Sequence, residues 1–307
     1  MVGRFCHGGG RHGKTGGGLC PLRHLQDRVD AAGRSRWAGR LWVTPIAWAD
    51  VDELTQQRAK AFGAVADTYA RVRPGYPAEA LVWLVPADAR RVLDIGAGTG
   101  ALTGGLLSLG LEVIAVEPDP EMRRVLARRL PSADVRAGRA EQIPVEAGAV
   151  DAVLGAQMWH WVDPTPAAAE VARVLRPGGT LGLLWNLRDE RVEWMAELGA
   201  LVPGEDVWGR GAPTAPLPEG SPFDGGSLRQ FPWSQELAPE ALVDLMATRS
   251  RLQVLDAGER QAVLTEVGKL ARTHPDLRGR RVIEVPYVTR CFRAVRRAGG
   301  DAGAAPA

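Results

Sequence analysis

From residue 90 to residue 188, short apolar segments alternate with longer ones in which apolar residues recur every three or four positions. The short segments are nearly continuous runs of Val, Leu, Ile and Ala, which is typical of strands buried on both faces of a parallel sheet. The strands are predicted at Arg91–Ile95, Glu112–Glu117, Asp134–Arg136, Ala149–Ala156 and Thr180–Trp185. The helices are predicted at Ala101–Leu109, Pro120–Leu130 and Pro164–Leu175. This alternation predicts right-handed crossovers and a doubly wound α/β fold.

The flanking segments have a less regular pattern. Helices are expected before the alternating region, at Glu53–Val72 and Ala78–Val85. After it, residues 203–227 are rich in Gly and Pro and are expected to form a surface loop or lid. The remaining predicted elements are a strand at Phe231–Gln235, helices at Pro239–Met246 and Asp256–Thr273, and a last strand at Arg281–Ala294. Proline at position 286 of the last strand suits a sheet edge or a bulge.

The two ends of the chain differ from the middle in composition. Residues 1–50 contain ten glycines and little apolar periodicity, so we predict a disordered basic extension there. Residues 51–296 are predicted to form one domain, and residues 297–307 a flexible tail. Residues 1–50 also hold eight basic and three acidic residues, whereas residues 51–307 hold 30 basic and 33 acidic ones. A slightly acidic main body argues against nucleic-acid binding and favours a small or neutral substrate.

Other global features restrict the location of the protein. No apolar run approaches the roughly 20 residues that a membrane span requires, so no membrane association is expected. Three cysteines in 307 residues do not make a disulfide framework, and a reducing, cytoplasmic location is the expectation. No pattern in the sequence predicts an oligomeric state.

Two motifs near the N-terminus have a structural context that argues against function. The segment Gly8–Thr15 has the spacing of a phosphate-binding P-loop, but it lacks a preceding strand and is followed by three glycines that oppose a helix. The four residues Cys6, His12, Cys20 and His24 lack the closely spaced cysteine pair of structural zinc sites. We therefore expect neither a nucleoside triphosphate site nor a metal site there.

The segment Asp94–Gly100, with the sequence DIGAGTG, joins the first predicted strand to its helix. Ligands of open α/β sheets bind beyond the carboxyl ends of the strands, and glycines let the backbone approach a ligand closely. The carboxylate of Asp94 would repel a pyrophosphate but could accept hydrogen bonds from an ammonium group, directly or through water. Glu117 ends the second strand, where an acidic residue can bind both hydroxyls of a ribose. Gly138–Glu141 follow the third strand, where an adenine ring would lie. Together these positions outline an adenosine with an amino-acid tail.

These motifs resemble those of the class I S-adenosylmethionine (SAM)-dependent methyltransferases, and most closely the small-molecule enzymes of the type-11 domain group. The sequences VLDIGAGTG and VIAVEPD resemble their first motif and its continuation, and LRPGG at Leu175–Gly179 resembles the turn before their fifth strand. The helix and loop up to RPGYP at Arg73–Pro77 and the segment QMWHW at Gln157–Trp161 are also similar, and the trans-aconitate-type methyltransferases share this outline.

The resemblance implies a Rossmann-like, seven-stranded, mostly parallel sheet whose last strand is antiparallel. It implies a cofactor-binding sheet at about residues 60–190 and an acceptor-side region at about 186–275. It also implies SAM as the cofactor. The implied cofactor-binding residues are Tyr69, Arg73, Asp94, Gly96, Ala97, Gly98, Gly100, Glu117, Pro118, Ala140, Glu141 and Gln157.

Within this set the resemblance implies separate roles. Asp94 and the glycines would contact the methionine portion, with Gln157 near its tail, and Glu117 would hold the ribose. Ala140 and Glu141 would frame the adenine, and Asp119 would lie near its edge or begin the next helix. Tyr69 and Arg73 would close over the cofactor. Many relatives have Asp where this chain has Arg139, so the backbone of Ala140 and the side chain of Glu141 must recognise the adenine, or Arg139 points to solvent.

His160 lies just after the fourth strand, where an acceptor would approach the methyl group. It is either a general base or substrate orienter, or a packing residue between Trp159 and Trp161. Carboxylate and thiolate acceptors would need no base.

Two other functions stay open at this level. The turn also fits the G-x-G-x-x-A pattern of nicotinamide-dependent oxidoreductases, although Asp94 argues against it. A SAM- or adenosine-binding sensor without catalytic activity would have the same cofactor motifs.

Overall fold

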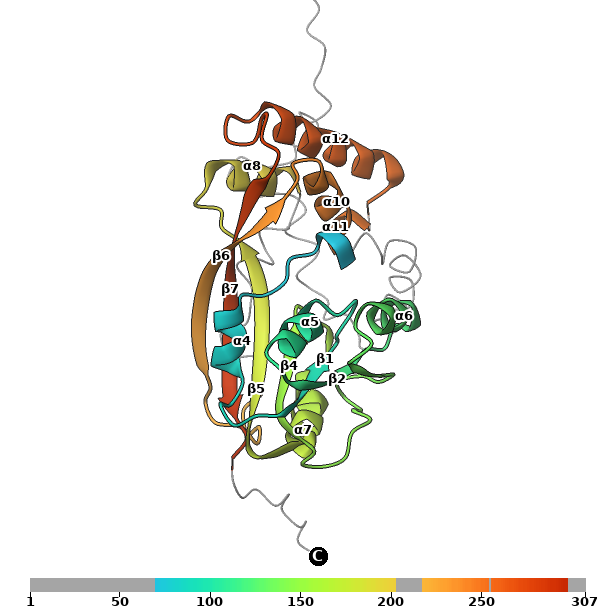
Figure 1. Cartoon of the computed structure of the whole chain (residues 1–307), viewed down its shortest axis with the longest axis vertical. Coiled ribbons are helices and arrows are strands. Elements are labelled where there is room, and N and C mark those ends of the chain that lie inside the picture. The colour runs from blue at the N-terminus through green and yellow to red at the C-terminus, as the bar shows by residue number, and fades with distance from the viewer. Residues whose placement is uncertain (1–69, 203–216, 254, 298–307) are drawn as a thin grey trace, which may run out of the picture. The chain divides into compact units, whose positions relative to one another are not determined.

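The computed structural model describes residues 70–202, 217–253 and 255–297, which belong to one compact unit at residues 57–307 (Figure 1). These residues form a seven-stranded sheet with the strand order β3-β2-β1-β4-β5-β7-β6. All neighbouring strands pair in parallel except at β7, which is antiparallel to both β5 and β6. The strands are β1 (Arg91–Ile95), β2 (Glu112–Val116), β3 (Asp134–Arg136), β4 (Val150–Ala156), β5 (Leu175–Arg188), β6 (Ser227–Leu237) and β7 (Ile283–Val295). The predicted doubly wound, mostly parallel sheet with an antiparallel last strand is confirmed.

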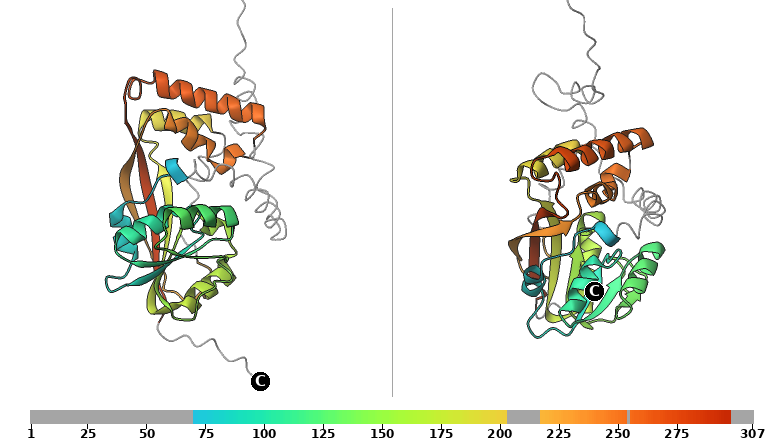
Figure 2. Two further views of the ribbon diagram at one scale, coloured as in Figure 1. Left: turned by 45° about the vertical axis from the view of Figure 1, so that its right-hand side comes forward. Right: turned by 45° about the horizontal axis from the view of Figure 1, so that its top comes forward.

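Helices cover both faces of this sheet (Figures 1 and 2). The covering helices are α4 (Ala78–Leu84), α5 (Ala101–Ser108), α6 (Pro120–Arg129) and α7 (Pro164–Val174). The first three pack on one face and α7 packs on the other. Side chains of a strand point alternately to the two faces, so Val92 of β1 meets α4 and α5, whereas Leu93 joins the cluster of α7. This burial on both faces explains the continuous apolar runs in the sequence.

The long strands β5, β6 and β7 extend past the other strands to a second group of helices. This helical cap consists of α8 (Glu193–Leu201), α10 (Ala241–Ala247), α11 (Ser250–Gln253) and α12 (Ala257–Thr273). Its core includes Trp194 and Met195 of α8 and also Ile283 and Tyr287 of β7, so the cap is packed on the sheet extension.

Several predicted element bounds need correction. β5 runs over Leu175–Arg188 rather than Thr180–Trp185, and a register irregularity near Val150 accommodates the turn at its start. β6 extends over Ser227–Leu237 rather than Phe231–Gln235, because pairing with β7 orders a segment whose side chains are mostly exposed. Helix α8 was not predicted, and its apolar face becomes recognisable only where it packs in the cap. The predicted helix at residues 53–72 lies outside the described residues except for residues 70–72, which are helical.

Of the two alternatives for Pro286, a sheet edge or a bulge, the edge is wrong, because β7 lies between two strands. The ladder between β5 and β7 ends at the pair Arg188 and Tyr287, and Pro286 lies one residue beyond this pair. The carbonyl oxygen of Pro286 accepts a hydrogen bond from the backbone of Asp189 just past this end. The nitrogen and the carbonyl oxygen of one strand residue face the same neighbouring strand, so the nitrogen of Pro286 also faces β5. This position lies beyond the last pair of the ladder, and the missing N–H therefore removes no hydrogen bond within the ladder.

The predicted extension at residues 1–50, most of the predicted lid at 203–227 and the tail after residue 297 lie outside the described residues. Among the residues that are described, no helix is long and apolar enough to cross a membrane.

Candidate functional site

The glycine turn between β1 and α5 is fixed against the end of β2. The backbone N–H groups of Gly96 and Ala97 both donate to the carbonyl oxygen of Val116, at 2.8 and 3.1 Å. The turn closes where the N–H of Gly100 donates to the carbonyl of Ala97 at 2.9 Å, and α5 begins at the next residue. Ala97 is buried and packs against β2 and α6.

Three glycines of this turn adopt left-handed conformations, but their surroundings differ. Gly96, Gly98 and Gly100 have φ values of 66°, 56° and 90°, which favour glycine. A Cβ atom would lie 2.9 Å from the side chain of Met158 at Gly96 and 2.8 Å from Leu130 at Gly100. At Gly98 the nearest atom would be 3.8 Å away. Gly96 and Gly100 are therefore required for packing, whereas Gly98 leaves its side of the turn open.

Asp94 is a fully buried carboxylate at the end of β1. The hydroxyl of Thr103 donates to its Oδ2 at 2.6 Å, while Oδ1 has no hydrogen-bond partner among the described residues. Burial raises the pKa of Asp94 to about 7, the Thr103 hydrogen bond lowers it, and the charge of Glu117 raises it. A buried carboxylate with one unpaired oxygen is suited to a ligand that donates hydrogen bonds or carries positive charge.

Glu117 connects the end of β2 to the glycine turn. Its Oε2 accepts the N–H of Gly98 and its Oε1 accepts the N–H of Asp119, both at 2.9 Å. Burial raises the pKa of Glu117, and these two backbone hydrogen bonds oppose the shift. Because each carboxylate oxygen can accept more than one hydrogen bond, Glu117 orients the turn and keeps capacity for ligand hydroxyls.

Asp119 has the structural role that was one of its two predicted alternatives. Its Oδ1 accepts the N–H of Met122 at 2.7 Å and caps α6, whereas its buried Oδ2 has no hydrogen-bond partner in the described part of the chain. The guanidinium of Arg123 donates to the carbonyl oxygens of Glu117 and Pro118, at 2.8 and 2.6 Å. Pro118 thus belongs to a backbone segment held at the carboxyl end of β2.

Ala140 and Glu141 follow β3, as expected. Ala140 is buried in the core under α7. The Oε1 atom of Glu141 accepts the N–H of Asp163 at 3.1 Å, which ties this loop to the start of α7. Arg139 lies 3.7 Å from the other oxygen of Glu141, and its side chain is 55% exposed. Both side chains are therefore engaged with each other at the surface near the predicted adenine position.

Gln157 follows β4 in a strained conformation, with a φ of 59°. Its N–H donates to the carbonyl of Leu184 at 2.9 Å, and its side-chain amide donates to the carbonyl of Asn186 at 3.2 Å. The next residue, Met158, fills the space beside Gly96. The segment after β4 is therefore locked between the glycine turn and the end of β5.

The three residues after Met158 form a short 3-10 helix, η1 (Trp159–Trp161). Trp159 is buried in the core, while His160 and Trp161 are exposed and their rings lie 4.8 Å apart. Only Trp159 is thus a core residue. His160 stands on the surface beside Trp161.

The two residues predicted to close over the cofactor have different outcomes. Tyr69 lies outside the described residues. Arg73 is partly buried, and its guanidinium donates to the carbonyl oxygen of Thr248, at the end of α10, at 2.7 Å. Arg73 therefore joins the N-terminal segment to the helical cap in this structure.

Sequence reasoning missed the buried polar residues that support the site. Thr103 follows the glycine turn by three residues, and a polar residue on the inner side of α5 was the available signal. Asn186 and Thr289 are buried on the neighbouring strands β5 and β7 and form a 2.6 Å hydrogen bond. Their pairing depends on the register of β5 with β7, which no local pattern contains.

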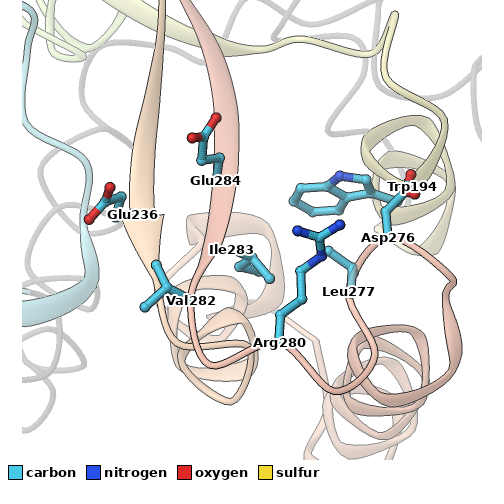
Figure 3. Close-up of a pocket in the computed structure, with 8 residues that line it drawn as sticks. All are labelled: Trp194, Glu236, Asp276, Leu277, Arg280, Val282, Ile283 and Glu284. Carbon is cyan, nitrogen blue, oxygen red and sulfur yellow. The ribbon is translucent and has the colours of Figure 1, made fainter.

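A pocket of about 410 Å³ lies elsewhere, at the end of β6 and β7 next to the cap (Figure 3). It is lined by Trp194, Glu236, Asp276, Leu277, Arg280, Val282, Ile283 and Glu284. None of these residues belongs to the glycine turn or to the ends of β1, β2 and β4. The pocket is therefore separate from the candidate site.

Comparison with known proteins agrees with the geometry. Residues 93–183 match a family model described as a methyltransferase domain. An uncharacterized methyltransferase of Mycobacterium tuberculosis is 50% identical over 236 residues, which cover 76% of this chain and 95% of that protein. An uncharacterized methyltransferase-like protein of Schizosaccharomyces pombe is 35% identical over 246 residues, which cover 76% and 94%.

A solved structure supports the fold as well. A protein assigned as a type II methyltransferase from Anaeromyxobacter dehalogenans superposes with a TM-score of 0.56 at 24% identity. The superposition covers 73% of this chain and 97% of that one.

Proposed function

The chain belongs to the class I SAM-dependent methyltransferases of the type-11 group, and from this premise we propose that it transfers a methyl group from SAM to a small-molecule acceptor. Membership shows a methyltransferase enzyme. The identity of the cofactor in this chain and the kind of acceptor are the proposed part.

The single observation that carries the proposal is the buried Oδ1 of Asp94, which has no hydrogen-bond partner among the residues that the structure describes. Burying a carboxylate without a partner is costly unless a ligand completes its hydrogen bonds. The ammonium group of SAM is a suitable donor, directly or through one water molecule. The same charge would repel the pyrophosphate of a nicotinamide cofactor, which disfavours the oxidoreductase alternative. The open side of Gly98 leaves room for the methionine portion next to this carboxylate.

The remaining predicted contacts fit the other parts of the cofactor. Glu117 is held by the N–H groups of Gly98 and Asp119 and can still accept the two ribose hydroxyls. Pro118, Ala140 and Glu141 follow β2 and β3, where the adenine would lie.

The bound cofactor would supply an activated methyl group on a sulfonium, so the protein mainly has to place the acceptor in line with that group. Gln157 faces the end of β5 from a fixed backbone position and is suited to orient ligands between the turn and the acceptor side. His160 is exposed nearby and is proposed as the base or orienter for acceptors that carry a proton.

A small-molecule acceptor is supported by charge. Residues 51–307 hold more acidic than basic residues, so electrostatic attraction for nucleic acid is not expected. The few cysteines of the chain suit a reducing, cytoplasmic location.

The test is calorimetric titration of SAM, S-adenosylhomocysteine (SAH) and NADH into the wild type and Asp94→Ala. We expect micromolar binding of SAM and SAH that is lost in the variant. Binding of NADH without SAM would refute the proposal. A panel of small acceptors with methyl-labelled SAM then distinguishes an enzyme from a sensor. A sensor would bind SAM but transfer the labelled methyl group to none of the acceptors.

A further inference from the structure

Asn186 is the single asparagine among the 307 residues. It lies at the end of β5, only 7% exposed, and its side chain uses both its donor and its acceptor. The amide Nδ2 donates to the carbonyl oxygen of Gly75 at 2.9 Å, and Oδ1 accepts the hydroxyl proton of Thr289 at 2.6 Å. An ionised aspartate of the same size would offer acceptors alone, whereas the amide supplies a donor and an acceptor in one planar group.

The orientation of this amide follows from the neighbouring donors. The indole N–H of Trp233 donates to the Thr289 hydroxyl oxygen at 2.7 Å. Trp233 has no acceptor there, so the single hydroxyl proton of Thr289 must point to Asn186. The oxygen of the amide therefore faces Thr289, and its NH₂ group faces Gly75. A buried network in which every hydrogen bond has a fixed direction specifies one arrangement.

The network contacts both sides of the candidate site. The backbone carbonyl of Asn186 accepts the side-chain amide of Gln157 at 3.2 Å, and Met158, the next residue, packs against Gly96 of the glycine turn. On the other side, Asn186 holds Gly75. A continuous series of contacts thus runs from Gly75 through Asn186 and the segment after β4 to the glycine turn.

Residues 73–77 form an irregular segment that lies outside the helices and strands and ends at Pro77, the N-cap of α4. Side chains of other elements hold this region at its carbonyl groups: Gln235 of β6 donates to Val72 at 3.1 Å, and Asn186 donates to Gly75. Arg73 donates to the end of α10. The Asn186 hydrogen bond ties the segment to the carboxyl end of β5, beside Gln157.

We propose that Asn186 is a positioning residue for methyl transfer, which fixes segment 73–77 and Gln157 around the bound cofactor through its hydrogen bonds with Gly75 and Thr289. This inference rests on the proposed function. It predicts that the surroundings of the Asn186 side chain change when the cofactor binds. It also predicts that breaking this hydrogen-bond network weakens cofactor binding, although no direct cofactor contact is removed.

The single asparagine allows a direct spectroscopic test. Protein labelled with ¹⁵N only at asparagine side chains gives one NH₂ pair, which belongs to Asn186. We expect this pair to shift on titration with SAH. An NH₂ pair that does not move at saturating SAH would overturn the proposal.

Variants separate positioning from general stability. Asn186→Asp keeps the acceptor for Thr289 but places a carboxylate oxygen against the Gly75 carbonyl, and we expect SAH binding to weaken about tenfold, the effect of losing one hydrogen bond. Thr289→Val removes the donor and should weaken binding in the same direction, whereas Thr289→Ser retains the hydroxyl and should restore it. Val267→Ala, which makes a cavity in the buried core of the helical cap, is the matched destabilised control.

The control lowers the melting temperature and is expected to leave SAH affinity unchanged. If Asn186→Asp behaves like Val267→Ala, the network is only structural and the proposal fails. Failure of the proposed function gives a different result, because the wild type itself would then bind no SAH.

Discussion

Substitution of Asp94 by asparagine tests the central electrostatic feature of the site. The change keeps the size of the side chain and an oxygen that accepts from Thr103, but removes the charge. A hydrogen bond to a charged group contributes about 1.5–3 kcal/mol, so SAM affinity should fall roughly 10- to 100-fold.

The pH dependence of SAM affinity is a second quantity that can be worked out from the structure. With the pKa of Asp94 raised to about 7, ligand binding to the carboxylate form should be about tenfold weaker at pH 6 than at pH 8. At pH 7 binding should release about half a proton, which calorimetry in phosphate and Tris buffers measures through their different ionisation enthalpies. Burial also raises the pKa of Glu117, which is present in both proteins, so the part of the pH dependence that disappears in Asp94→Asn is assigned to Asp94 and its coupling with Glu117.

The same pKa shift affects the stability of the ligand-free protein. A carboxyl group whose pKa is raised on folding stabilises the protein at low pH, and this stability is lost as the pH rises through about 7. A shift from 3.8 to about 7 corresponds to at most about 4 kcal/mol in the free energy of unfolding. Asp94→Asn should therefore show a flatter dependence of stability on pH between 4 and 8.

The reasoning is refuted if Asp94→Asn binds SAM as the wild type does, or if wild-type binding releases no proton near pH 7. Thr103→Val is the matched test of the local environment. It removes the hydrogen bond that lowers the pKa of Asp94, so the midpoint of the binding profile should move to higher pH.

Further substitutions test other parts of the site. Glu117→Gln should weaken SAM binding at least tenfold, because an amide has one acceptor oxygen where the carboxylate has two. An unchanged SAM affinity in calorimetry would contradict this role. Gly100→Ala should lower the melting temperature more than Gly98→Ala, since its Cβ meets a side chain at 2.8 Å, while Gly98→Ala should mainly reduce SAM affinity; equal melting curves would contradict the assigned roles. Trp159→Ala should destabilise the fold by about 3–5 kcal/mol in denaturant titrations, whereas His160→Ala should leave stability unchanged and lower turnover of proton-bearing acceptors; a destabilised His160→Ala would return that histidine to a packing role.

The sequence by itself determined the sheet-forming region and the cofactor side of the site. Its strands are buried on both faces, so their apolar runs are local and continuous, and β1 and β3 were predicted with the bounds that the structure has. The glycine turn and the acids at the strand ends could be located because each follows its strand directly along the chain. That these residues bind SAM stays a prediction.

Only the tertiary structure decided how these residues are paired and supported. Contacts between β1, β2 and the segment after β4 attach Glu117 to Gly98 and divide Gly96, Gly98 and Gly100 into packing and open positions. They also leave Oδ1 of Asp94 without a hydrogen-bond partner in the part of the chain that the structure describes. The network of Asn186 depends on residues 103 and 111 positions away in sequence. Helix α8 forms because the cap buries its apolar face, and the long β6 forms because it pairs with β7 along its length. Such contacts join segments that are distant along the chain, and no local periodicity records them.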